Sequence, residues 1–179
     1  MALSDINTIL EKVKKLEKGE KLDLSSDEDL SLAVMNLISI EEHLFFTAEK
    51  SGKSQYVTLL NEVRTMRKEL MKKLIRDYEG EVWCISKHLL ASSMRLMEVG
   101  TKMLGKGERQ EAKKLFDSSY KLYSLFWGLN LGVIEREKLL KGNDVLTLLS
   151  DDDPPKKKEV SVFSKLGDLL NHILDCCKE

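Results

Sequence analysis

The sequence has little proline and no long uncharged stretch. Only two prolines occur in 179 residues, and they are adjacent at 154–155, so long helices can run through most of the chain. The longest stretches without a charged residue are 30–40 and 122–134, well short of the ~20 apolar residues that a membrane-spanning helix needs. The N-terminus lacks the apolar core of a signal peptide. We therefore predict no membrane span and a cytoplasmic location.

The chain also lacks a charge imbalance and a disulfide framework. It has 29 basic and 30 acidic residues, so no overall positive charge favours nucleic acid, and a nucleic-acid partner is not expected. Its three cysteines are an odd number, and Cys176 and Cys177 are adjacent. This arrangement is typical of reduced thiols in an intracellular protein. Glycine-rich phosphate loops and zinc-spaced cysteine pairs are missing as well.

What the sequence does have is apolar residues at helical spacing. Four long segments, 27–49, 54–76, 81–104 and 112–134, each carry an apolar stripe with steps of mostly three and four residues. Short glycine-containing turns separate them, which predicts an all-α, up-down antiparallel four-helix bundle. The first stripe, expected to face the core, consists of Leu30, Ala33, Val34, Leu37, Ile38, Leu44, Phe45 and Ala48.

The segment 81–104 has apolar residues on nearly all sides. Trp83, Leu90, Met94 and Met97 lie off its main stripe. A helix of this kind is usually the central one of a bundle, buried by neighbours on several sides. Buried polar groups need partners, so a polar stripe within this helix is the first place to look for function. That stripe consists of Cys84, His88, Arg95 and Glu98.

The bundle is predicted to span residues 27–140, with further segments at both ends. An apolar stripe within residues 1–18 predicts a short amphipathic helix that acts as a docking or dimerising arm. Residues 141–159 contain an acidic triplet, two prolines and a basic triplet, and predict a linker. Residues 160–179 predict a second amphipathic helix. We expect it to bind a partner through five apolar side chains, Phe163, Leu166, Leu170, Ile173 and Leu174.

One part of the chain, residues 93–126, resembles a single tetratricopeptide-repeat unit. Gly100, Ala112 and Phe116 have the spacing of that motif, although Ser124 stands where the family often has proline. The resemblance implies a helical hairpin in which the glycine and alanine let the two helices approach closely. It also implies a protein-binding role.

A second resemblance is to histidine phosphotransfer domains, which are four-helix bundles with an exposed histidine in a pattern such as H-x-L-K-G-S. Here the corresponding stretch is His88 to Ser93, with Ala91 in place of the lysine and Ser92 in place of the glycine. The resemblance implies phosphotransfer through His88. The departures matter because that lysine steadies the phosphoryl group and that glycine admits the partner.

Acidic residues, a cysteine and a histidine on neighbouring helices also suggest a metal site. Helix bundles build such sites from inward carboxylates and histidines, and the metals expected here are iron, manganese or zinc. The candidate ligands are Glu41, Glu62, Glu81, Cys84, His88 and Glu98. The alternative is that Glu41 pairs with Arg67 or Arg95 and that His88 is a hydrogen-bonded core residue.

These patterns favour a non-catalytic helical protein that acts by protein–protein interaction or self-association, as an adaptor or scaffold. Its partner would be an unidentified protein or a second copy of itself, and no cofactor is expected. One alternative is a ferritin-like metal-binding bundle. A further alternative is histidine phosphotransfer through His88.

Overall fold

The computed structural model describes residues 25–75, 80–133 and 166–167 of the 179-residue chain. Within these residues all regular structure is helical, which confirms the all-α prediction, and no strand occurs. The predicted arm at 1–18, the linker at 141–159 and all but two residues of 160–179 lie outside the described residues. The four long helices are α2 (Ser25–Ser51), α3 (Gln55–Leu74), α4 (Glu81–Gly105) and α5 (Arg109–Asn130).

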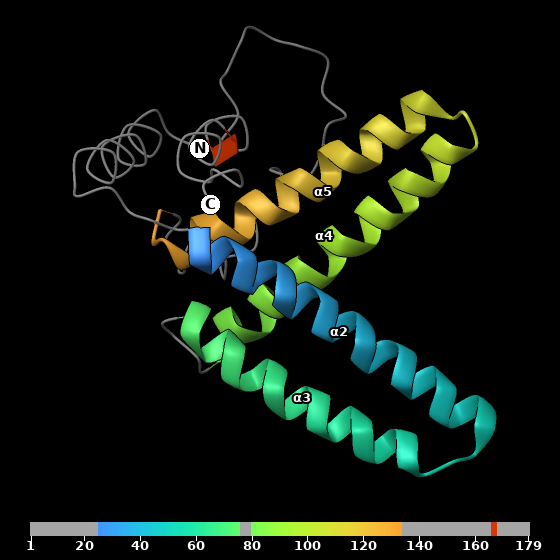
Figure 1. Cartoon of the computed structure of the whole chain (residues 1–179). Coiled ribbons are helices and arrows are strands. Elements are labelled where there is room, and N and C mark those ends of the chain that lie inside the picture. Colours follow the sequence, from blue (N-terminus) through green and yellow to red (C-terminus); the bar gives the residue numbers. More distant parts are fainter. Residues whose placement is uncertain (1–24, 76–79, 134–165, 168–179) are drawn as a thin grey trace, which may run out of the picture.

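The four helices form two antiparallel hairpins, α2 with α3 and α4 with α5 (Figure 1). The turns contain Gly52 and Gly107, which have φ values of 65° and 83°. Glycine adopts these left-handed conformations without the steric cost that a Cβ atom imposes. The hairpins meet at the ends that lie away from these turns, and α2 crosses α4 there (Figure 1).

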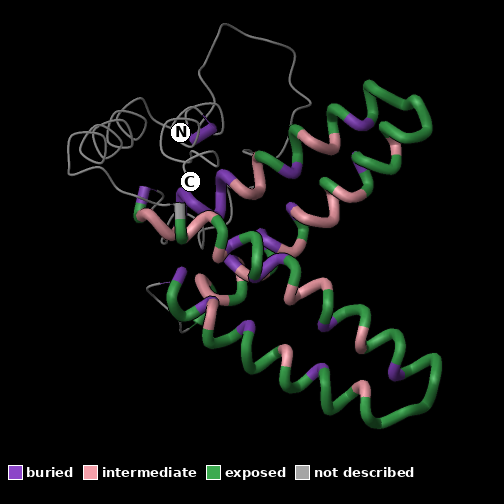
Figure 2. The backbone as a smooth tube through the Cα atoms, viewed as in Figure 1, coloured by how far each residue is buried: buried purple, intermediate pink, exposed green. Residues whose placement is uncertain are grey.

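The shared core lies where the hairpins cross. Figure 2 shows the buried positions gathered in this region, whereas the outer parts of both hairpins are largely exposed. Phe126 is fully buried, with its ring centroid 5.3 Å from that of Trp127. Each such side chain contributes roughly 1.5–3 kcal/mol by burial. The core consists of Val34, Met35, Met71, Leu74, Ile75, Leu89, Leu90, Leu125, Phe126, Trp127 and Leu129.

The prediction that segment 81–104 is buried on several sides is wrong. Helix α4 packs along α5 but meets α2 only near the crossing, because the two hairpins diverge. One side of α4 is therefore open to solvent. Its exposed residues include Cys84, His88, Ser92, Met97 and Val99.

Small residues let α4 and α5 approach closely. Ser86, Ser93 and Gly100 are seven residues apart on α4, and all three are buried. Ser93 Oγ donates to the Ser119 carbonyl at 2.9 Å, and Ser119 Oγ donates to the Ser93 carbonyl at 2.7 Å. A Cβ atom on Gly100 would lie 2.7 Å from the ring of Phe116. The glycine and phenylalanine are thus in contact, while the family resemblance itself remains a prediction.

Candidate functional site: charged contacts and exposed aromatic residues

Glu41 is held by two arginines inside the α2/α3 hairpin. Arg67 donates to both carboxylate oxygens, from Nε to Oε1 at 2.6 Å and from Nη2 to Oε2 at 3.2 Å. Arg64 Nε adds a bond to Oε2 at 2.9 Å. Glu41 and Arg67 are both buried, which confirms a buried Glu41 paired with one of the predicted arginines. Arg64 was not foreseen.

The surroundings of Glu41 favour its charged form. Burial alone raises the pKa of this carboxyl group, but the hydrogen bonds from Arg67 and Arg64 and their positive charges outweigh that effect. The pKa of Glu41 therefore lies below its ordinary value. Both carboxylate oxygens already accept hydrogen bonds from arginine, so Glu41 serves as a structural anion between the two helices.

Arg95 connects the two hairpins. Its Nη2 donates to the Glu42 carboxylate on α2, and its Nη1 donates to Glu98 Oε2 on its own helix at 2.6 Å. These hydrogen bonds, first that with Glu42 and then that with Glu98, raise the pKa of Arg95. A second polar contact joins the hairpins nearer the core, where the Ser31 and Tyr123 hydroxyl oxygens are 2.7 Å apart.

The structure does not gather the six candidate metal ligands. Glu41 and Glu98 are bonded to arginines, and Glu81, Cys84 and His88 lie exposed in the first part of α4. In the parts of the chain that the structure describes, no three His, Cys, Asp or Glu side chains are placed to hold a metal ion.

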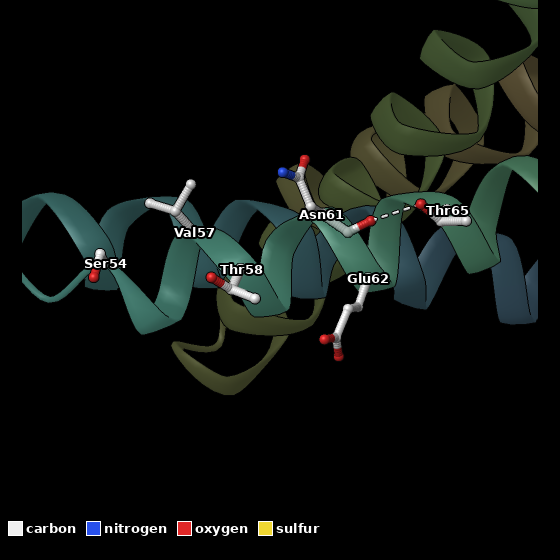
Figure 3. Close-up of a pocket in the computed structure, with 6 residues that line it drawn as sticks. All are labelled: Ser54, Val57, Thr58, Asn61, Glu62 and Thr65. Carbon is white, nitrogen blue, oxygen red and sulfur yellow. Dashed lines mark hydrogen bonds between the residues drawn. The ribbon is translucent and has the colours of Figure 1, made fainter.

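Glu62, the remaining candidate, belongs to a shallow surface depression on α3 (Figure 3). Five of its six lining residues come from that helix and the sixth, Ser54, is the helix N-cap; the side chains project outward from the helix. Thr65 Oγ1 donates to the Asn61 carbonyl at 2.9 Å instead of pointing to a ligand. The six are Ser54, Val57, Thr58, Asn61, Glu62 and Thr65.

His88 is exposed, which corrects its interpretation as a hydrogen-bonded core residue. It lies on the open side of α4, one turn before Ser92, which is exposed as well. Exposure is one property of a phosphotransfer histidine. The lysine that would steady a phosphoryl group is still replaced by Ala91, so His88 alone supports no second function.

An aromatic pair on α2 stands out among the exposed residues. Phe45 and Phe46 are 49% and 48% exposed, and their ring centroids lie 5.3 Å apart in an edge-to-face arrangement. Phe45 was expected in the core, and that prediction is wrong. The stripe on α2 ends up partly uncovered at this position because the second hairpin diverges from α2 beyond the Glu42–Arg95 contact.

Of the five residues predicted to bind a partner, the structure describes only Leu166. Leu166 is 1% exposed, and Tyr120 Oη on α5 donates to the carbonyl of the next residue, Gly167, at 3.2 Å. In this arrangement Leu166 is covered within its own chain. Phe163, Leu170, Ile173 and Leu174 lie outside the described residues.

One stretch of the described residues, Ser26–Ser51, is long and apolar enough to cross a membrane by length and composition. The same stretch packs along α3 and carries Glu41 between two arginines.

Comparisons with known proteins find no matching family model, no matching curated protein and no matching solved structure.

Proposed function

We propose that the protein acts without catalysis, by binding another protein chain through Phe45 and Phe46. The partner is a second copy or a different protein. The observation that carries the proposal is the aromatic pair itself, two large apolar side chains in mutual contact and each about half exposed. Aromatic residues are enriched among those that dominate binding at protein interfaces.

The position of the pair on α2 supports this role. Phe46 follows Glu42 by four residues, so both side chains project from nearly the same side of the helix. Glu42 contacts Arg95 of α4. The pair therefore continues the side of α2 that meets the second hairpin, just beyond the point where the hairpins separate. A partner segment placed there would contact the aromatic pair and extend an existing helix–helix contact.

Burial of the two rings would strengthen such a contact. Full burial of a phenylalanine is worth roughly 1.5–3 kcal/mol, and about half of each ring is still uncovered. Together the two rings would contribute roughly 1.5–3 kcal/mol to binding. This is on the order of a tenfold to hundredfold change in affinity.

The experiment compares the native size of the full-length protein in cell extract with that of the variant Phe45→Ser/Phe46→Ser. Size-exclusion chromatography is expected to show the parent in an assembly larger than one chain and the double variant at a smaller size. The matched control is Leu104→Ser, because Leu104 is equally exposed, at 50%, but lies at the far end of α4. Identical elution of parent and double variant would contradict the proposal.

A further inference from the structure

One side of α2 is uncovered along nearly its whole length. The stretch Ser26–Ser51 is apolar enough to cross a membrane, yet only 17% of its most apolar part is buried. Seven exposed residues recur on this side of the helix with alternating steps of four and three. This spacing places them along one face of a helix. They are Asp29, Ala33, Asn36, Ile40, His43, Thr47 and Lys50, and we call them the α2 seam.

The α2 seam faces away from both neighbours of α2. Glu41 is bonded to Arg67 of α3, so its side of α2 faces that helix. Glu42 is bonded to Arg95, so its side faces α4 of the second hairpin. Successive residues are about 100° apart around a helix, so Ile40 points about 100° from Glu41 and about 200° from Glu42. The α2 seam therefore lies on a third side of the helix, which neither hairpin covers.

The charged residues of the α2 seam lie at its two ends. Asp29 is near the start of α2 and Lys50 is in its last turn. The five residues between them include no Asp, Glu, Lys or Arg. Neither Asp29 nor Lys50 forms a salt bridge with another described residue. Opposite charges at the two ends make this face complementary to the same face of a second copy that runs in the opposite direction.

The register of such an antiparallel pair follows from the spacing. If a two-fold axis passes beside Ile40, this residue meets Ile40 of the second copy. Asp29 then lies level with Lys50 of the second copy, and the symmetry repeats this contact on the other side of the axis. The two members of each pair are equally distant from the axis to within one residue, or about 1.5 Å.

The residues between the centre and the ends are matched as well. Ala33 lies level with Thr47 of the second copy, and two small side chains let the helices approach closely. Asn36 lies level with His43 of the second copy. Asn36 Nδ2 donates to the Leu32 carbonyl of its own helix at 2.9 Å. Its Oδ1 is an acceptor that a ring N–H of His43 can reach across the pair.

We propose that α2 binds α2 of a second copy through the α2 seam, antiparallel, and makes a two-fold symmetric dimer. In such a contact the same patch serves both chains, so it must be complementary to itself, as the α2 seam is. From Asp29 to Lys50 the contact is about 32 Å long. It is separate from the aromatic pair, which continues the side of α2 that meets the second hairpin.

The first test is analytical ultracentrifugation of the purified full-length protein over a dilution series. We expect the mass of two chains, falling toward one chain on dilution. Ile40→Asp places two carboxylates together at the axis and should weaken association at least about tenfold. The matched control is Leu59→Asp on α3, because Leu59 and Ile40 are 45% and 43% exposed. It should associate like the parent, and circular dichroism checks that both variants stay folded.

A second set of variants tests the antiparallel direction. Asp29→Lys and Lys50→Asp each bring like charges together twice in their own dimer and should weaken it roughly threefold to thirtyfold. A mixture of these two variants should associate more tightly than either alone, because each chain supplies the charge that the other lacks. The double variant Asp29→Lys/Lys50→Asp should associate like the parent. Single variants that associate as tightly as the parent would contradict the antiparallel direction.

The variant Phe45→Ser/Phe46→Ser separates this dimer from the contact proposed for the aromatic pair. It leaves the α2 seam intact and should still form the dimer. A dimer that persists in Ile40→Asp but is lost in this variant would assign self-association to the aromatic pair and overturn the proposal. A purified parent that is monomeric at every concentration would overturn it too, without affecting the contact proposed for Phe45 and Phe46.

Discussion

At the scale of single residues, Glu41 combines a position in an apolar stripe with a charge that needs a partner. Its position between Ile38 and Phe45 was enough to predict burial and a basic partner. The choice among arginines depends on helix register and on where the hairpins separate, which the spacing within one helix does not determine. Arg67 of α3 faces Glu41 between the two helices of the first hairpin. Arg95 belongs to the second hairpin and contacts Glu42 of α2 instead.

Replacing Glu41 should therefore destabilise the protein. Glu41→Gln removes the charge that balances Arg67, whose side chain is only 6% exposed. Leaving one member of a buried ion pair unpartnered costs about 3–5 kcal/mol. We expect a clearly lower urea midpoint for Glu41→Gln. Glu62→Gln, on the exposed face of α3, should unfold at the parental midpoint, and equal midpoints for all three proteins would refute the role of Glu41.

The ion pair of Glu41 and Arg67 predicts that the free energy of unfolding depends on pH. The folded-state pKa of Glu41 is depressed, so its contribution to stability is present above the unfolded pKa of about 4.3 and is lost as the pH falls through the folded value. The difference in free energy of unfolding between the parent and Glu41→Gln should shrink when urea titrations are repeated from pH 6 down into the acid range. A difference that stays constant over this pH range would show that protonation of Glu41 does not cause the loss of stability in acid.

At the scale of secondary structure, periodicity predicted the helices well. The predicted segments 54–76 and 81–104 correspond to α3 at Gln55–Leu74 and α4 at Glu81–Gly105. Periodicity marks an apolar stripe but does not reveal whether another helix covers it. For this reason Phe45 and Met97 looked like core residues and are exposed.

The close contact between α4 and α5 yields a prediction at this scale. In Gly100→Ala the new Cβ would meet the Phe116 ring at 2.7 Å, so the ring or the helix must shift. Overpacking of this kind costs roughly 1–3 kcal/mol, which exceeds or equals the ~1 kcal/mol that alanine gains in helix propensity. The control is Gly105→Ala on the same helix, where a Cβ would meet no atom within 4 Å. We expect thermal denaturation at a lower temperature for Gly100→Ala than for Gly105→Ala, and the reverse order would contradict the contact.

At the scale of the whole molecule, the hairpins are joined mainly by the apolar core at their crossing. The Arg95 and Glu42 side chains are 36% and 45% exposed, and such surface ion pairs contribute less than about 1 kcal/mol. The sequence could not show this arrangement because each hairpin's stripes are compatible with full-length packing of all four helices. It could also not show that Leu166 is covered within its own chain, since that depends on the position of Tyr120.

The contributions of the apolar core and of the Arg95–Glu42 ion pair to the free energy of unfolding can be measured separately. Phe126→Ala removes a fully buried ring at the crossing and should cost about 3–5 kcal/mol of unfolding free energy. Arg95→Gln should cost less than about 1 kcal/mol. Chemical denaturation of the two variants beside the parent gives both values. Similar losses would mean that the polar contact contributes far more than its exposure indicates.

The central claim, that Phe45 and Phe46 contact another protein chain, is tested most directly by photo-cross-linking in cells. Phe46 is replaced by p-benzoylphenylalanine in the full-length protein, and Leu104, which is equally exposed, is replaced in a control. Illumination should produce a discrete cross-linked species from position 46 and not from position 104. The mass of that species distinguishes a second copy from a different protein. Absence of a cross-link at position 46, or the same products from both positions, would contradict the claim.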